Sequence, residues 1–375
     1  FQAEDGIRDN GAGLVGSEMC IRDRSKTHVY WLAEAAPSFV TSTYYRDEMP
    51  GWVKDFNADV LPEILGDTVW EQTVPPEFRT LARADSAVYE RDGIHTVFPH
   101  TSTSADSLER SLWTLTQPNT DRAVSFMARE AIDVLDLGQR EHVDYLALSF
   151  SATDHVGHAY GPLSQEQLDN LVRLDRELGD LFEYLDERVG EGRWVAGFSA
   201  DHGVMTMPEH LASEGEEAVR ISGSERRGAL GQALQEAFHS EGTPDQIAER
   251  MARAAEAAGL VAKAYTHFDL TSGQPADSFA VLFRNSYYPG RAAGLLSRFG
   301  IETRYAESEL VHGSRGTTHG SPYWHDRHVP LAFLGVGVEV GVSDARVYTV
   351  DLAPTLAALA GIPVPYDLDG RVIYR

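Results

Sequence analysis

The chain has 375 residues, and its hydrophobic fraction of 42% is enough to bury the core of one large domain or two modest ones. Its formal net charge of -25 argues against nucleic acid or an anionic membrane as a partner, because neither is attracted to such a surface. No run of about eighteen apolar residues occurs, so we expect no membrane-spanning helix.

Residues 1–24 repeat the tripeptide Ile-Arg-Asp and have neither helical nor strand periodicity. They resemble translated sequencing adapter, and a natural flexible leader is the alternative. Cys20, which is the single cysteine, lies within them, so the sequence does not indicate a redox compartment. We therefore treat 1–24 as a non-native leader and divide the remainder into 25–207, an inserted subdomain at 208–313, and 314–375.

The elements alternate as expected for a parallel sheet with helices packed on it. Residues 26–57 are aromatic and turn-rich, which favours irregular structure and short strands. Ser164 and Gln167 have the spacing of a capping box at the start of a long helix that ends at Gly190. Besides that helix we predict helices at 121–137, 245–258 and 352–360, buried strands at 143–150, 194–199 and 329–334, and a strand-like segment at 279–283.

Three clusters of potential metal ligands follow or adjoin these strands. Asp154 and His158 are four residues apart and can share one face of a helical turn, although a capping Asp followed by a surface His fits the spacing equally well. Asp201 and His202 come directly after a strand, but such a pair is more often a simple turn.

The third cluster is a glycine-flanked histidine, His319. His312, His325 and His328 are rivals of the same residue type, and local spacing does not exclude them. Two carboxylates and three imidazoles suit two borderline-soft cations better than one hard cation, so we expect two Zn²⁺ ions. Such a pair can assist in-line phosphoryl transfer, which would let an acidic protein bind phosphate.

The chain resembles the alkaline phosphatase superfamily, specifically bacterial phosphomonoesterases of the type I phosphodiesterase/nucleotide pyrophosphatase kind, from Lys26 to the end. The resemblance rests on six ordered stretches, at 148–158, 173–176, 200–203, 316–323, 328–330 and 351–357. Each stretch alone would be weak, but their order and spacing make the resemblance specific.

The resemblance implies that Asp154, His158 and His319 hold the first zinc ion, next to the leaving group. It implies that Asp201 and His202 hold the second. The family's further aspartate, its threonine or serine nucleophile and its phosphate-binding asparagine and Lys-x-Arg pair would all precede Lys26. Residues 41–43 are hydroxyl-bearing, but they align with a non-catalytic stretch.

The resemblance therefore implies zinc-dependent hydrolysis of phosphate monoesters through a covalent phospho-threonine intermediate in a parent enzyme. We expect the present chain to be inactive, because its nucleophile would lie upstream. Two alternatives remain, a phosphodiesterase or nucleotide pyrophosphatase, and a non-catalytic zinc-binding module. A sulfatase is disfavoured, because Cys20 lacks the required Cys-x-Pro-x-Arg-like context.

The fold implied is α/β, a three-layer α/β/α sandwich with a mainly parallel, alkaline phosphatase-like sheet, incomplete at its N-terminus and carrying an inserted α+β subdomain. We expect a poorly soluble monomer that acts on a small phosphorylated substrate and binds no nucleic acid. By resemblance we also expect a periplasmic or secreted location.

Overall fold

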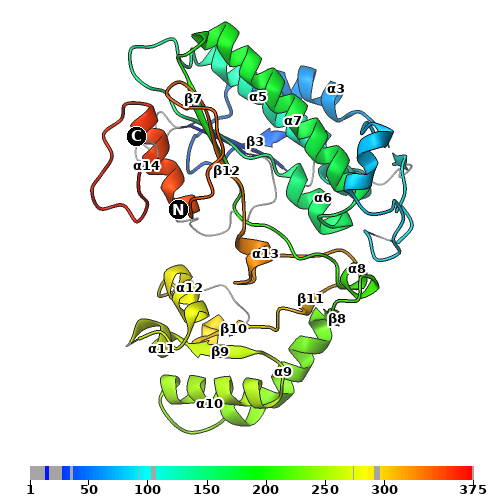
Figure 1. Ribbon diagram of the computed structural model, residues 1–375, viewed down its shortest axis with the longest axis vertical. Helices are drawn as coiled ribbons and strands as arrows, with labels where there is room; N and C mark the ends of the chain where they lie inside the picture. Colours follow the sequence, from blue (N-terminus) through cyan, green and yellow to red (C-terminus); the bar gives the residue numbers. More distant parts are fainter. Residues whose placement is uncertain are drawn as a thin grey trace. The chain divides into compact units, whose positions relative to one another are not determined.

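The computed structural model describes residues 13–16, 28–33, 37–91, 93–102, 107–272, 274–290 and 296–373. The chain divides into two compact units (Figure 1). The first unit contains residues 1–87, 94–200 and 330–375, and the second contains 88–93 and 201–329. The second unit includes the expected subdomain at 208–313 and extends beyond it on both sides. None of the described helices is long and apolar enough to cross a membrane.

The first unit places helices against short strands. Its strands are β1 (Gly13–Gly16), β2 (Val29–Leu32), β3 (Phe39–Val40), β4 (Val69–Trp70), β5 (His100–Thr101), β6 (Leu146–Leu148), β7 (Val195–Ser199) and β12 (Leu331–Gly335). Its α-helices are α2 (Gly51–Asp55), α3 (Leu61–Leu65), α4 (Ser107–Leu115), α5 (Asn119–Val134), α6 (Ala152–Tyr160), α7 (Gln165–Leu185) and α14 (Leu352–Leu359). Short 3₁₀ or π segments lie at Phe56–Val60, Pro76–Leu81, Asp186–Gly190 and Thr349–Asp351.

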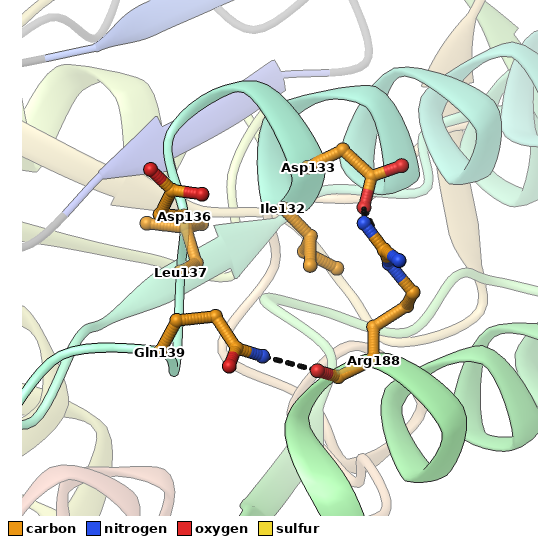
Figure 2. A pocket seen from close by; sticks show the side chains of 6 residues that line it. All are labelled: Ile132, Asp133, Asp136, Leu137, Gln139 and Arg188. Atoms are coloured by element: carbon orange, nitrogen blue, oxygen red, sulfur yellow. Dashed lines mark hydrogen bonds and ion pairs between the residues drawn. The ribbon is translucent and has the colours of Figure 1, made fainter.

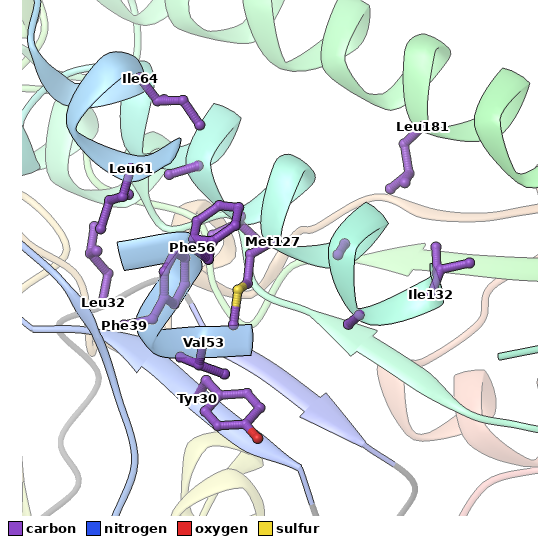
Figure 3. Close-up of a cluster of buried hydrophobic side chains, with 14 of the residues drawn as sticks. Tyr30, Leu32, Phe39, Val53, Phe56, Leu61, Ile64, Met127, Ile132 and Leu181 are labelled. Atoms are coloured by element: carbon purple, nitrogen blue, oxygen red, sulfur yellow. The ribbon is translucent and has the colours of Figure 1, made fainter. Parts of the chain in front are cut away.

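The core of the first unit lies between α5, the α2–α3 segment and the strands of the N-terminal sheet (Figure 3). Met127 and Ala131 of α5 are fully buried there, and so are Tyr30, Phe39 and Val53. This burial follows the helical spacing of apolar residues read from the sequence, because positions three or four apart share one helix face. The core therefore fixes α5, on which α6 and α7 also pack.

Strand directions differ from the mainly parallel arrangement that we expected. β1 pairs antiparallel with both β2 and β6, and β7 pairs antiparallel with β12, with Val195 opposite Gly335. Among the described strands, only β8 and β11 pair in parallel. The physical reason is that β6 and β7, which flank α7 in sequence, do not pair with each other, so α7 closes no parallel crossover between paired strands.

Most predicted elements of the first unit are present with shifted ends. α5 starts two residues before the predicted Asp121, and β6 is shorter than predicted and half-buried rather than buried. Ser164 does cap α7, accepting a hydrogen bond from the Gln167 backbone at 3.0 Å. The reciprocal half of the capping box is absent, because the Gln167 side chain donates to the Thr153 carbonyl instead.

One prediction near the start of the chain is wrong. Residues 51–65 are helical, where we expected irregular structure and short strands up to Asn57. Residues 13–16 form β1 although the leader lacks strand periodicity, because neighbouring strands on both sides satisfy their backbone groups. The remaining residues of 1–24, Cys20 included, lie outside the described residues, and their adapter origin stays a prediction.

In its described residues, the second unit combines a helical hairpin with two short strand pairings. Its elements are α8 (Pro208–Ser213), β8 (Val219–Ser222), α9 (Gly223–Phe238), α10 (Pro244–Ala257), β9 (Lys263–Thr266), α11 (His267–Thr271), α12 (Ser278–Ser286), a 3₁₀ turn at Ser297–Phe299, β10 (Ile301–Arg304), β11 (Glu309–His312) and α13 (Trp324–Arg327). α10 has the capping box of Thr243 and Gln246 and agrees with the prediction within one residue.

The predicted strand at 279–283 is wrong, because this segment forms α12. An apolar run of five residues does not distinguish strand from helix by periodicity. The preceding Asp277 decides the matter, since its carboxylate accepts a hydrogen bond from the Ala280 backbone at 2.8 Å and caps the helix.

Candidate metal centre

The first ligand pair lies on α6, the helix that follows β6 in the first unit. Asp154 and His158 are on one helix face, with Asp154 Oδ1 and His158 Nε2 3.3 Å apart. Both side chains are about one-third exposed, at 34% and 31%. The N-cap of this helix is Ser151, so Asp154 is not the capping residue that the alternative interpretation required.

The second pair follows β7, at the start of the second unit. Asp201 Oδ2 and His202 Nε2 are 3.5 Å apart. His202 Nδ1 lies 2.9 Å from the Gly203 carbonyl oxygen, so a proton on Nδ1 is donated to that carbonyl. Nε2, the other ring nitrogen, lies on the side that faces Asp201, and partners like this carbonyl usually orient metal-binding histidines.

Both pairs have the donor separation that a tetrahedral zinc site requires. Two ligand atoms at about 2.1 Å from such an ion are about 3.4 Å apart. The measured separations of 3.3 Å on α6 and 3.5 Å after β7 lie on either side of that value. The residues present therefore fit zinc in chemistry and spacing, although one pair comes from a helix and the other from adjacent residues of a loop.

His319 lies on a loop of the second unit whose backbone is held just before this residue. Gly316 and Gly320 have φ angles of 70° and 106°, a region that favours glycine. The Gly316 backbone donates to the Tyr89 carbonyl, and the Thr317 hydroxyl donates to the Met205 carbonyl at 2.7 Å. These contacts hold the residues that precede His319.

His319 and His202 pack face to face within the second unit. Their ring centroids are 3.3 Å apart with an interplanar angle of 13°, closer than the roughly 4.5–7 Å usual for aromatic pairs. Two of the five predicted ligands are thus brought into one small volume. Because Asp154 and His158 belong to the other unit, their pairing with His319 stays a prediction.

The rival histidines are placed differently. His325 Nε2 lies 3.2 Å from the Ser321 hydroxyl, and the His328 ring stacks on Trp324 with centroids 4.4 Å apart. His312 is in β11, opposite Ser222 of β8. Each of these three histidines takes part in local packing or strand pairing, so each is a weaker ligand candidate than His319.

Asp326 is a residue that the sequence interpretation missed. Its side chain is 5% exposed, and its Oδ2 accepts a hydrogen bond from the Ser321 backbone at 2.6 Å. Its carbonyl accepts a hydrogen bond from the Gly203 backbone at 2.8 Å. Asp326 therefore ties the His319 loop to the Asp201–His202 loop. Its position in the run His-Asp-Arg-His was visible in the sequence, but nothing local indicated burial.

A second buried carboxylate, Asp121, lies behind α6 in the first unit. It is 2% exposed, and burial raises its pKa from 3.8 to about 7, although the hydrogen bond from the Ala152 backbone opposes that shift. Asp121 was predicted only as the start of a helix. Its contact with α6 depends on tertiary packing that periodicity does not encode.

A hollow of about 270 Å³ in the first unit lies away from these ligands, at the end of α5 (Figure 2). Its charged groups already interact with each other, since Arg188 Nε donates to Asp133 at 2.7 Å and Tyr184 donates to the same carboxylate at 2.6 Å. Gln139 also donates to the Arg188 carbonyl. We therefore assign the hollow no ligand.

The chain is 29% identical to alkaline phosphatase PhoV of Synechococcus elongatus, over 98% of this chain and 68% of the relative. It is 28% identical to alkaline phosphatase PafA of Elizabethkingia meningoseptica, over 92% of this chain and 67% of that relative. The chain thus spans about two thirds of the length of each.

The structure is similar to the crystal structure of wild-type alkaline phosphatase PafA, with a TM-score of 0.75 and 26% identity over 92% of this chain and 70% of that one. This likeness confirms the α/β, alkaline phosphatase-like fold class. Residues 10–298 match the family described as type I phosphodiesterase / nucleotide pyrophosphatase, a range that includes four of the predicted ligands but not His319. The chain belongs to the type I phosphodiesterase / nucleotide pyrophosphatase family, whose members are phosphoester hydrolases.

Proposed function

We propose that the parent enzyme of this chain hydrolyses phosphate monoesters in a zinc-dependent reaction. Asp154, His158 and His319 hold one ion, each through a single carboxylate oxygen or imidazole nitrogen. Asp201 and His202 hold the other. The observation that carries the proposal is the match of both Asp–His separations to the donor spacing of tetrahedral zinc.

Two zinc ions would polarise a phosphoryl oxygen and stabilise the charge that develops during in-line displacement. The protein's own contribution is to hold the donors ready. The Gly203 carbonyl keeps the proton of His202 on Nδ1, and Asp326 holds the two ligand loops of the second unit together. Asp201, whose side chain is 76% exposed, leaves the second site open toward solvent.

The covalent phospho-threonine route is the finer part of the proposal. Its nucleophile was expected upstream of Lys26, where only residues 13–16 are described. The expected inactivity of the present chain likewise stays a prediction. Periplasmic or secreted location, a monomeric state and a small phosphorylated substrate complete the proposal, and they rest on the resemblance.

Phosphodiester or pyrophosphate hydrolysis is the second candidate, favoured by the description of the matched family. The same zinc ligands would serve either reaction, so the two differ in the groups that bind the substrate. Relatives named as alkaline phosphatases favour the monoester.

The test is an assay of the purified chain with zinc and either an aryl phosphate or a bis-aryl phosphate. Zinc-dependent release from the monoester that is lost in His319→Ala would support the proposal, and preferential release from the diester would replace it with the second candidate. Zinc binding without release would agree with the expected inactivity or with a non-catalytic zinc module. A chain that binds no zinc would contradict every version.

A further inference from the structure

α6 is held at its first turn by a buried carboxylate from another helix. Asp121 of α5 accepts a hydrogen bond from the Ala152 backbone at 2.9 Å. Ser151, at the N-cap, makes no side-chain capping bond. Asp121 therefore satisfies a backbone donor that a helix normally leaves to its own cap.

The same turn is held from α7 by two buried amides. Asn170 Nδ2 lies 3.0 Å from the Thr153 hydroxyl, and Gln167 Nε2 lies 3.1 Å from the Thr153 carbonyl. Their exposed fractions are only 1% and 7%. Three side chains from two helices thus converge on the two residues that directly precede Asp154.

The far end of α6 is also anchored. Arg83 Nη2 donates to the carbonyl of Tyr160, the last residue of the helix, at 2.9 Å. The Arg83 carbonyl in turn accepts a hydrogen bond from Gln165 at the start of α7. α6 is therefore fixed at both ends relative to α7.

Ordinary stabilisation of a short helix does not fully account for these contacts. A nine-residue helix is marginal alone, but apolar packing would stabilise it at less cost than buried polar groups. Asp121, Gln167 and Asn170 each keep one buried oxygen without a hydrogen-bond partner among the described residues. Such atoms are costly to bury, so we attribute their presence to the geometry that these side chains impose on α6.

The residues of α6 that are held and the two candidate ligands differ in burial. Of the three residues that are held, Ala152 and Tyr160 are fully buried and Thr153 is half-buried, whereas Asp154 and His158 lie on the partly open side of the same helix. Rotating a helix by one residue turns a side chain by about 100°, so a small slip of α6 would separate the two donors from one metal position.

We propose that Asp121, Gln167 and Asn170 are positioning residues that fix α6 so that Asp154 and His158 face one metal ion. This inference rests on the proposed function, because it assigns that metal site to α6. Supporting groups of this kind typically change metal affinity by about 10- to 100-fold when they are removed.

The experiment measures the zinc affinity of the full chain by competition with a chelator. Thr153→Val and Asn170→Ala each remove one side of the same hydrogen bond, so each should weaken zinc binding by about 10-fold. The double variant should be no worse than either single one, because both break a single interaction. Ile132→Val, a conservative change in the core beside α5, is the matched control and should leave zinc affinity unchanged.

A second pair of variants separates positioning from folding. Asp121→Asn keeps an oxygen that accepts from the Ala152 backbone and should retain zinc affinity, whereas Asp121→Ala should lose about 10-fold. Amide hydrogen exchange without zinc gives an independent reading. In Asn170→Ala, protection should fall in α6 and persist in α5.

The inference would be overturned if Asn170→Ala and Ile132→Val changed zinc affinity equally, or if the effects of Thr153→Val and Asn170→Ala simply added. It would also be overturned by unchanged exchange in α6. These outcomes leave the proposed function intact as long as Asp154→Asn removes one of the two tightly bound zinc ions. Failure of the unaltered chain to bind zinc would overturn both.

Discussion

The two Asp–His pairs reach nearly the same donor separation by different physical routes. On α6, helical geometry alone brings residues four apart into contact, and buried side chains from α5 and α7 fix the helix. After β7, adjacent residues of a loop are held by backbone hydrogen bonds and by Asp326. Neighbouring side chains therefore set the orientation of the helix that carries the first pair. In the second pair, neighbouring groups set the conformation of the loop itself.

The largest expected effect comes from removing a ligand of either pair. His158→Ala and His202→Ala should each weaken the binding of one zinc ion by more than about 100-fold, because even supporting groups account for 10- to 100-fold. Zinc titration of each variant measures this. His328→Ala, which removes a ring stacked on Trp324, is the control and should bind zinc normally. Equal losses in the control would show that the ligand assignment is wrong.

Gly203→Ala should break the loop pair while leaving the helix pair intact. A Cβ at this position would overlap the carbonyl oxygen of His325, so the loop must move. We expect a loss of about 1–3 kcal/mol in the free energy of unfolding, together with weaker binding of one zinc ion. Gly228→Ala, in α9 with open space around it, should be tolerated. The comparison fails if both variants behave alike in denaturation and zinc titration.

The smallest expected effect on zinc binding belongs to Asp121, which supports the helix pair. This buried carboxyl group should instead make the stability of the chain depend on pH. Burial raises the pKa of Asp121 to about 7, so the folded state holds this proton more tightly than the unfolded state does. Its contribution to stability is complete below about pH 4 and is lost as the pH rises through 7. Asp121→Asn should remove this loss, on the order of 2–3 kcal/mol between pH 5 and 8, because about two pH units separate pH 5 from the folded pKa. Denaturant unfolding of the zinc-free chain at both pH values measures it, and identical pH profiles would contradict it.

The helices were largely predictable, because their signals are local. α10 and α14 follow the predicted boundaries within one residue, since caps, prolines and glycines mark their ends. α12 was mistaken for a strand because a short apolar run carries no decisive period, and the capping Asp277 was overlooked. Strand pairing was the least predictable feature, since it depends on which distant segments meet.

The candidate site was predictable in its residues but not in its support. Asp154 and His158 have a spacing that any helix turns into a pair, and the structure places them so. The contact of His202 with His319 joins segments more than a hundred residues apart, and the resemblance assigned these two residues to different ions. Asp121, Asn170 and Asp326 gave no signal, because a buried polar residue looks like a surface residue until its partners are known.

The most direct test of the account is the number of zinc ions bound per chain after dialysis against metal-free buffer and reloading. The account predicts two ions for the unaltered chain, and one for Asp154→Asn and for Asp201→Asn alike. One ion in the unaltered chain, two ions retained in either variant, or no bound ion at all would contradict it.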